Sequence, residues 1–366
     1  MRKSREENPE DWGDRQKLER YMESIKIVAQ RLDCHFEQLT LVDNVTNGVN
    51  AILKSPLPCF EKPGGTILCT NLMDHLVSHA LKAAVQQRGM QLHTVEIPLR
   101  IESKEALIDL FKTEIDKVQD LRLALLDHIT NTPAMTFPIE ELIEKFHQRS
   151  VPVLIDGAHA PNQIPNLSLT KLGCDFYVGS LHKWMFGARG TAFVFVKNQS
   201  STNLIQPPVS WGYVPSPSDL SKTSSFHLQF FHQGTRDETA FFTIPKAIEF
   251  IDLICGGKER IYEYNANLSQ KAKEMLDERW GNEDSLIPSS LEAPYMKMIK
   301  LPHLPGYNKS VADASRLSEI LLGYHQIVVV VVCINEELFL RISTQIYNCM
   351  EDYLYLGNVI DELRHE

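Results

Sequence analysis

The chain has 366 residues, of which 43% are hydrophobic and 23% are charged, and its formal net charge is −10. This length and composition are typical of a soluble globular protein with one large domain or two medium ones. The negative charge disfavours nucleic acid or an anionic membrane as the main partner, because both bind basic surfaces.

The cysteines and the first residues bear on the cellular compartment. Seven cysteines are scattered along the chain without a CxxC pair, which disfavours a zinc site and a disulfide framework and favours a reducing compartment. The N-terminal residues contain no apolar secretory segment, and the longest apolar run, 327–334, is too short to span a bilayer. We therefore expect a cytoplasmic protein.

Strands and helices alternate in the first two thirds of the predicted fold. Residues 1–14 are polar and are expected to be loose, and apolar residues at helical spacing predict a helix over 18–32. Strands are predicted at 39–42, 66–70, 92–97, 121–126, 151–155, 174–178 and 193–196, and helices over 73–87 and 138–149. This alternation predicts an α/β fold, with a three-layer αβα large domain and a mainly parallel sheet over 15–255.

The pattern changes after residue 200. A stretch rich in proline and serine, 206–229, is expected to be irregular and to lie near the site or a subunit contact. Residues 245–280 are predicted to be helical and to lead into a smaller C-terminal α/β domain over 256–366. Its predicted strands are 296–301, 327–334 and 338–342, and its helices 310–322 and 350–364.

An acid and an amine follow two of the predicted strands. Asp156 comes directly after the apolar run 151–155, and Lys183 follows strand 174–178. The carboxyl ends of parallel strands meet at the sheet edge where open α/β sheets bind ligands. There a lysine can form a Schiff base, and an acid can keep a cofactor's pyridine nitrogen protonated. The pair indicates pyridoxal phosphate, although Lys183 alone also fits a surface charge and Asp156 alone a turn cap.

Other polar residues stand where they could bind the same ligand. Residues 46–48, Thr-Asn-Gly, open a predicted helix whose free N–H groups favour an anion, and residues 233–237 form another such turn. His159 is within reach of the ligand that Asp156 would bind, or is a structural histidine. Arg341, within an apolar strand, needs a partner, which is either a structural acid or a substrate carboxylate.

Taken together, these motifs resemble the class V aminotransferases of pyridoxal-phosphate fold type I, and especially the isopenicillin N epimerase-like branch. The resemblance covers roughly residues 25–360. The matching segments are 46–48, 131–133, 156–161, 180–184, 234–237 and 340–343. It implies that Lys183 carries the cofactor as a Schiff base and moves the proton at Cα, that Asp156 pairs with the ring nitrogen, and that His159 and Asn131 lie near the phenolic oxygen.

The resemblance also assigns the remaining groups. It implies a phosphate site made of four residues, Thr46, Asn47, Ser180 and His182. Thr235 would reach the neighbouring subunit's phosphate, which implies a homodimer. Arg341 would bind the carboxylate of a small amino-acid substrate, and Asn131 is also assigned to substrate binding. His75 is our preference for the residue that stacks on the ring, with His79 as the alternative.

Two features leave the reaction open. Relatives usually begin with an Asn-His-Gly motif that lines the substrate pocket, and none precedes Asn8 here, so the chain is expected to be shortened at its N-terminus. We expect an epimerase, a transaminase or a cysteine lyase, and as an alternative a cofactor-binding but weakly active or inactive partner subunit. A persulfide-forming desulfurase is disfavoured because Cys333 and Cys349 look structural. A nucleotide-binding protein ranks last because GxGxxG and GxxxxGK[ST] are absent.

Overall fold

The computed structural model describes residues 2–12, 16–198, 204–205, 209–210 and 224–365. In these ranges a seven-stranded sheet has the order β1-β7-β6-β5-β4-β2-β3. The strands are β1 (Leu39–Val42), β2 (Thr66–Thr70), β3 (Gln91–Val95), β4 (Leu121–Asp127), β5 (Val153–Asp156), β6 (Phe176–Ser180) and β7 (Ala192–Val196). The five strands from β6 to β3 are parallel to one another, while β7 is antiparallel to both of its neighbours.

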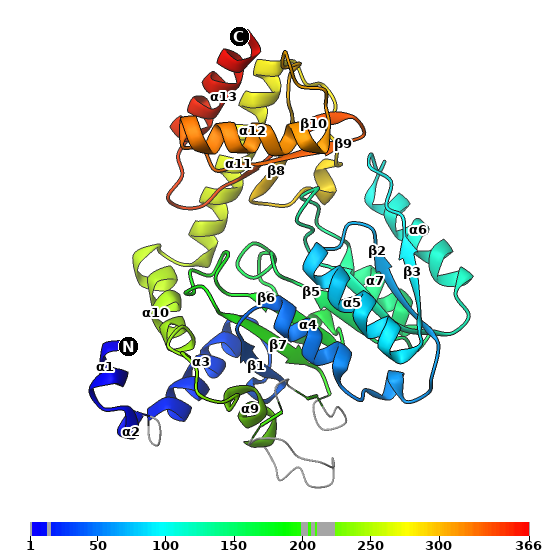
Figure 1. Cartoon of the computed structure of the whole chain (residues 1–366), viewed down its shortest axis with the longest axis vertical. Helices are drawn as coiled ribbons and strands as arrows, with labels where there is room; N and C mark the ends of the chain where they lie inside the picture. The colour runs from blue at the N-terminus through cyan, green and yellow to red at the C-terminus, as the bar shows by residue number, and fades with distance from the viewer. Residues whose placement is uncertain (1, 13–15, 199–203, 206–208, 211–223, 366) are drawn as a thin grey trace.

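Helices cover both faces of this sheet (Figure 1). One face packs against α4 (Val45–Lys54), α5 (His75–Arg88) and α9 (Ser224–Phe231). The other packs against α3 (Lys17–Arg31), α6 (Lys104–Lys117), α7 (Ile139–His147) and α10 (Ile244–Glu249). Buried residues alternate between the two cores along each strand, so that Leu125 and Leu126 face opposite layers. The predicted three-layer αβα fold is therefore confirmed.

Helix α4 begins close to the sheet for two local reasons. Asn44 caps it by accepting a hydrogen bond from the Asn47 amide at 2.8 Å. Gly48 lets its first turn approach β6, since a Cβ there would lie 2.6 Å from Cγ1 of Val178. The helix therefore presents its N-terminus beside the carboxyl ends of the strands.

The N-terminal residues differ from the expected loose segment. Residues 2–11 form α1 (Arg2–Glu7) and α2 (Pro9–Asp11). Trp12 is only 2% exposed, packs edge-on against Phe242 with ring centroids 5.5 Å apart, and has the Arg20 guanidinium over its ring. Burial of one large ring anchors this polar stretch to the large domain, which a prediction from average composition overlooks.

Two other segments also differ from the predictions. Of the stretch 206–229, residues 206–208 and 211–223 lie outside the described residues, while the part from Ser224 onward is helix α9 rather than irregular. The helical stretch 245–280 is divided into α10, a π-helical turn (Phe250–Ile254) and α11 (Lys258–Trp280). Gly256 and Gly257, whose φ angles are 80° and 99°, interrupt the helix between the π-helical turn and α11.

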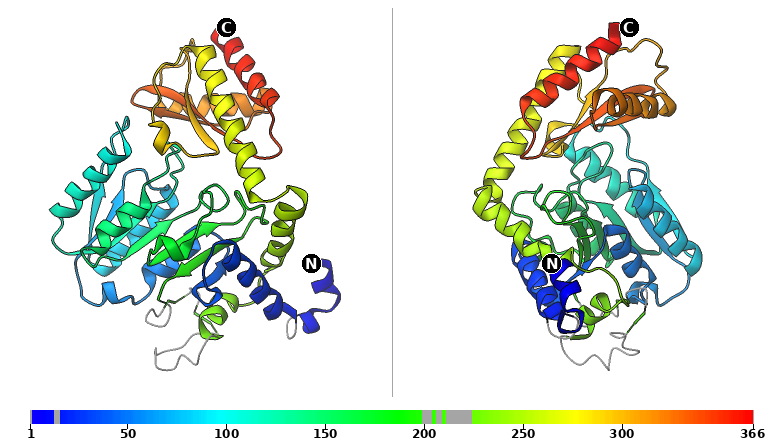
Figure 2. Two further views of the ribbon diagram at one scale, coloured as in Figure 1. Left: turned by 180° about the vertical axis from the view of Figure 1, so that it is seen from behind. Right: turned by 60° about the vertical axis from the view of Figure 1, so that its left-hand side comes forward.

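The C-terminal residues form a second, smaller α/β unit, into which α11 rises from the large domain (Figures 1 and 2). Its antiparallel sheet has the order β8-β10-β9. The strands are β8 (Met296–Lys300), β9 (Val330–Ile334) and β10 (Glu337–Ser343), and the helices packed with them are α11, α12 (Val311–His325) and α13 (Met350–His365). In the part of the chain that is described, no helix is both long and apolar enough to cross a membrane.

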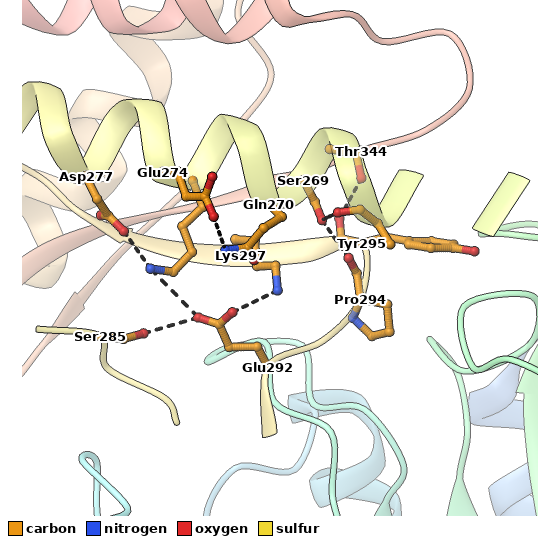
Figure 3. Close-up of polar contacts among 12 residues, drawn as sticks. Ser269, Gln270, Glu274, Asp277, Ser285, Glu292, Pro294, Tyr295, Lys297 and Thr344 are labelled. Atoms are coloured by element: carbon orange, nitrogen blue, oxygen red, sulfur yellow. Dashed lines mark hydrogen bonds and ion pairs between the residues drawn. The ribbon is translucent and has the colours of Figure 1, made fainter. Parts of the chain in front are cut away.

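A buried ion network within this unit lies next to a backbone contact with the large domain (Figure 3). Glu292 pairs with Lys297 at 2.8 Å and lies 3.9 Å from Lys273, and both Glu292 and Lys297 are less than 10% exposed. Glu292 also forms a β-bridge with Met135, and the Thr136 amide donates to the Leu291 carbonyl at 2.7 Å. The loop that carries Asn131 is therefore attached to the start of β8.

Candidate active site

A cavity of about 180 Å³ opens at the carboxyl edge of the parallel strands. Seven of the predicted site residues line it, namely Thr46, Asn131, Asp156, His159, Ser180, His182 and Lys183. They come from the start of α4 and from the ends of β4, β5 and β6 or the loops that follow. The sheet topology thus brings together groups that are far apart in the sequence.

Lys183 and His159 form the reactive end of this cavity. The Lys183 amine lies 2.9 Å from Nε2 of His159. Burial is the main cause that lowers the pKa of both groups, and the Lys183 charge lowers that of His159 further. Burial thus disfavours the ammonium form of Lys183 relative to the uncharged amine, which is the form that attacks a carbonyl carbon.

Asp156 lies at the floor of the cavity and is 3% exposed. One of its oxygens accepts a hydrogen bond from the Ala158 amide at 2.9 Å. Burial raises the pKa of Asp156 to about 6, while the Ala158 amide and Lys183 oppose that rise. A cationic ring nitrogen would keep this carboxylate ionised, so the pyridinium of pyridoxal phosphate fits the floor.

Another part of the cavity lining suits a phosphate. Thr46 and Ser180 line it, and the N-terminus of α4 supplies a positive dipole end. His182 lies beside them and donates through Nδ1 to the Thr191 carbonyl at 2.9 Å. Asn47 is not among the lining residues, and its side-chain amide instead lies 3.5 Å from a carboxylate oxygen of Asp43. Asn44 lines the wall in its place.

Arg341 belongs to the small domain and contacts the site through Asn131, although it does not itself line the cavity. Its Nη1 donates to both the backbone oxygen, at 2.9 Å, and the side-chain oxygen of Asn131, and its buried Nε has no partner among the described residues. Burial lowers the pKa of Arg341 to about 10, so the guanidinium remains charged at neutral pH. The partner is thus an amide rather than a structural acid, and a guanidinium held in this way can bind a carboxylate.

Four predicted residues do not line the cavity of their own chain, namely Asn47, His75, Thr235 and Arg341. His75 is exposed at the first position of α5, and Leu76 and Val77 line the wall there. Thr235 is also exposed and absent from the lining, although the neighbouring Arg236 bonds the carboxylate of Asp43 at 2.7 Å.

Three polar residues of the lining were not predicted as site residues, namely Asn44, Asp74 and Asp127. For Asp127 the signal was available, since it ends an apolar strand exactly as Asp156 does. Asn44 and Asp74 are helix caps, a role that the sequence indicates without showing that the cap faces a cavity.

The chain matches known proteins over nearly its whole length. The model of the family "Aminotransferase class-V" matches residues 15–356. An L-cysteine desulfhydrase of Arabidopsis thaliana is 28% identical, covering 89% of this chain and 75% of that protein. An isopenicillin N epimerase of Amycolatopsis lactamdurans is also 28% identical, covering 89% and 81%.

Solved structures show the same fold. A cysteine desulfurase from Thermococcus onnurineus NA1 superposes with a TM-score of 0.72 and 20% identity over 95% of this chain and 84% of that one. The cystine C-S lyase C-DES gives 0.73 and 17% over 94% and 87%. The family match, and the cavity that joins Lys183 to Asp156, show that the chain belongs to the class V aminotransferases and is a pyridoxal-phosphate-dependent enzyme.

Proposed function

We propose that the chain is a lyase that cleaves the Cβ–S bond of cysteine or of a similarly small β-thio amino acid. Cysteine and water would give pyruvate, ammonia and sulfide. The observation that carries this proposal is the Lys183 amine, 2.9 Å from neutral His159, in a cavity of only about 180 Å³ that also contains Asp156. The desulfhydrases among the similar proteins support it.

Each site residue has a role in this reaction. When bound, the cofactor draws electrons away from Cα of the amino acid. Lys183 takes the Cα proton, Asp156 holds the proton on the ring nitrogen, and Arg341 orients the substrate carboxylate. His159 stays neutral beside Lys183, which leaves the amine free to accept that proton.

A persulfide-forming desulfurase is a less suitable reaction for this site. Such an enzyme passes sulfur to a cysteine near the substrate, and no cysteine lines the cavity in the ranges that the structure describes. The Cys333 thiol donates to the Lys309 carbonyl at 2.9 Å. Cys349 is exposed, and its hydrogen bond with Glu351 raises the pKa of the thiol. Free sulfide is therefore the expected product.

Epimerisation is the second candidate, because the isopenicillin N epimerase and the Arabidopsis desulfhydrase have the same sequence identity to this chain, 28%. The two reactions separate at the step after Cα–H loss. In deuterium oxide, an epimerase returns the amino acid with deuterium at Cα and forms no sulfide. A lyase releases sulfide and pyruvate in equal amounts, and transamination would convert the cofactor to its amine form.

The decisive assay incubates the purified chain, loaded with pyridoxal phosphate, with L-cysteine. We expect equal amounts of sulfide and pyruvate from the native chain and none from Lys183→Ala. Deuterium exchange without sulfide would favour the epimerase. If no amino acid reacts at a rate that depends on Lys183, the lyase proposal fails and the weakly active partner subunit becomes the better account.

The proposal includes a homodimer and a cytoplasmic location. Thr235 is exposed and does not line the cavity of its own chain, which supports the proposal that it contacts a neighbouring subunit's site. All seven cysteines are free, which supports a reducing compartment. Sedimentation tests the homodimer, and fractionation of cells tests the cytoplasmic location. A mixture of inactive Lys183→Ala and Thr235→Ala chains should regain activity if the sites are shared.

A further inference from the structure

Asp127 and Asp156 lie side by side at the floor of the cavity. They are the last residues of β4 and β5 and are direct register partners in the parallel pairing. Register partners point to the same face, and neighbouring strands are ~4.8 Å apart. Both side chains line the cavity and are 4% and 3% exposed. Asp74 and Lys183 are the other residues of the lining with formal charges.

The two acids differ in their hydrogen bonds. Asp156 accepts from the Ala158 amide at 2.9 Å, which stabilises its ionised form. Oδ2 of Asp127 is buried and has no hydrogen-bond partner in the described part of the chain. Burial and the charge of Asp156 raise the pKa of Asp127 well above its usual range, whereas that of Asp156 rises only to about 6. Near neutral pH, the proton of this pair therefore resides on Asp127.

We propose that Asp127 is a positioning residue of the cofactor site, a neutral carboxylic acid that donates its O–H to the carboxylate of Asp156. The inference rests on Asp156 being the acid that faces the cofactor's ring nitrogen. The bond satisfies the otherwise unpartnered oxygen of Asp127 and fixes the orientation of the Asp156 carboxylate. It also keeps a second negative charge from forming beside Asp156, so the ring nitrogen meets one oriented carboxylate.

The protonation of Asp127 is tested first on protein from which the cofactor has been removed. In the infrared difference spectrum at pH 7 between the native chain and Asp127→Asn, we expect the carbonyl band of a protonated carboxylic acid, present only in the native chain. Asp74→Asn is the matched control, since asparagine keeps the helix cap and the band should remain. Absence of the band from the native spectrum would overturn the proposal, whatever the cofactor does.

The positioning role is tested by cofactor affinity. Asp127→Asn retains an N–H donor to Asp156 and should bind pyridoxal phosphate within about threefold of the native chain. Asp127→Leu has similar size but no donor, and should bind at least ~10-fold more weakly. Thermal unfolding of both cofactor-free variants establishes that they fold. Equal affinity of the two variants would overturn the role of the hydrogen bond, whereas unchanged affinity in Asp156→Asn would overturn the site assignment itself.

Discussion

The amine of Lys183 lies 2.9 Å from Nε2 of His159, and burial lowers the pKa of both groups. Gln163 holds the backbone of His159 in place, because its Nε2 donates a hydrogen bond to the His159 carbonyl oxygen at 2.7 Å. Gln163 in turn accepts from the Tyr295 amide at 2.9 Å, directly before β8. The position of the imidazole beside the lysine therefore depends on a contact with the small domain.

Replacing His159 should mainly affect turnover. His159→Leu removes the polar neighbour of Lys183, and we expect kcat to fall roughly 10²-fold or more because proton transfer loses a positioned group. His159→Gln keeps a hydrogen-bonding group and should retain more of the activity. Steady-state assays of both variants measure the effect, and equal activity of His159→Leu and the native chain would contradict it.

Replacing Arg341 should mainly affect substrate binding. Arg341→Ala removes the guanidinium that we expect to bind the substrate carboxylate, so KM should rise roughly 10²-fold while the cofactor remains bound. Arg316→Ala, on the outer side of α12, is the control and should leave KM unchanged. A KM for Arg341→Ala within twofold of the native value would show that the carboxylate binds elsewhere.

His128 should make the cofactor-free protein less stable in acid. Burial lowers the pKa of His128 from 6.5 to about 3 in the folded chain, while its Nδ1 lies 2.8 Å from the Tyr177 hydroxyl. Below pH 6.5 the unfolded chain binds a proton that the folded chain does not. The free energy of unfolding should therefore decrease as pH falls, by up to ~1.4 kcal/mol per pH unit from this residue.

Urea unfolding at pH 7, 6 and 5.5 measures that slope. In His128→Gln, the slope of the free energy of unfolding against pH below 6.5 should be smaller by up to the value for one proton, ~1.4 kcal/mol per pH unit. In His35→Gln, whose side chain is largely exposed, this slope should equal that of the native chain. A His128→Gln slope equal to the native one would mean that this imidazole also titrates normally in the folded chain.

The buried pair Glu292–Lys297 should stabilise the small domain at the point where its backbone contacts Met135 of the large domain. Lys297→Met leaves a buried carboxylate with the longer contact to Lys273 and a hydrogen bond from the Ser285 hydroxyl at 3.2 Å. We expect a loss of about 3 kcal/mol in the free energy of unfolding. The double variant Lys297→Met with Glu292→Leu removes both charges and should recover most of that loss. Denaturant unfolding of the native chain, both single variants and the double variant measures the coupling, and additive losses would contradict it.

The strands and the two poles of the site could be predicted because the signal is local. Asp156 follows an apolar run and Lys183 a second one, and the rules for parallel sheets place both at one edge. Helix α6 is not among the predicted elements, although its buried residues Leu107, Phe111 and Ile115 recur at helical spacing. The sequence therefore contains the periodicity that predicts this helix.

Other features depend on contacts that a local pattern does not contain. The Arg341–Asn131 bond joins residues 210 positions apart in different domains, so the sequence showed only that Arg341 needed a partner. Which side chain of the first turn of α5 faces the cavity depends on how the helix is rotated, and the structure places Leu76 rather than His75 in the wall. The role of His75 in ring stacking stays a prediction.

The central claim is that Lys183 carries pyridoxal phosphate in the cavity that Asp156 floors. The most direct measurement is the absorption spectrum of the purified chain with the cofactor, before and after borohydride. We predict a band near ~420 nm that borohydride removes, and its absence from Lys183→Ala. A native chain without this band, or a Lys183→Ala chain that shows it unchanged, would contradict the account.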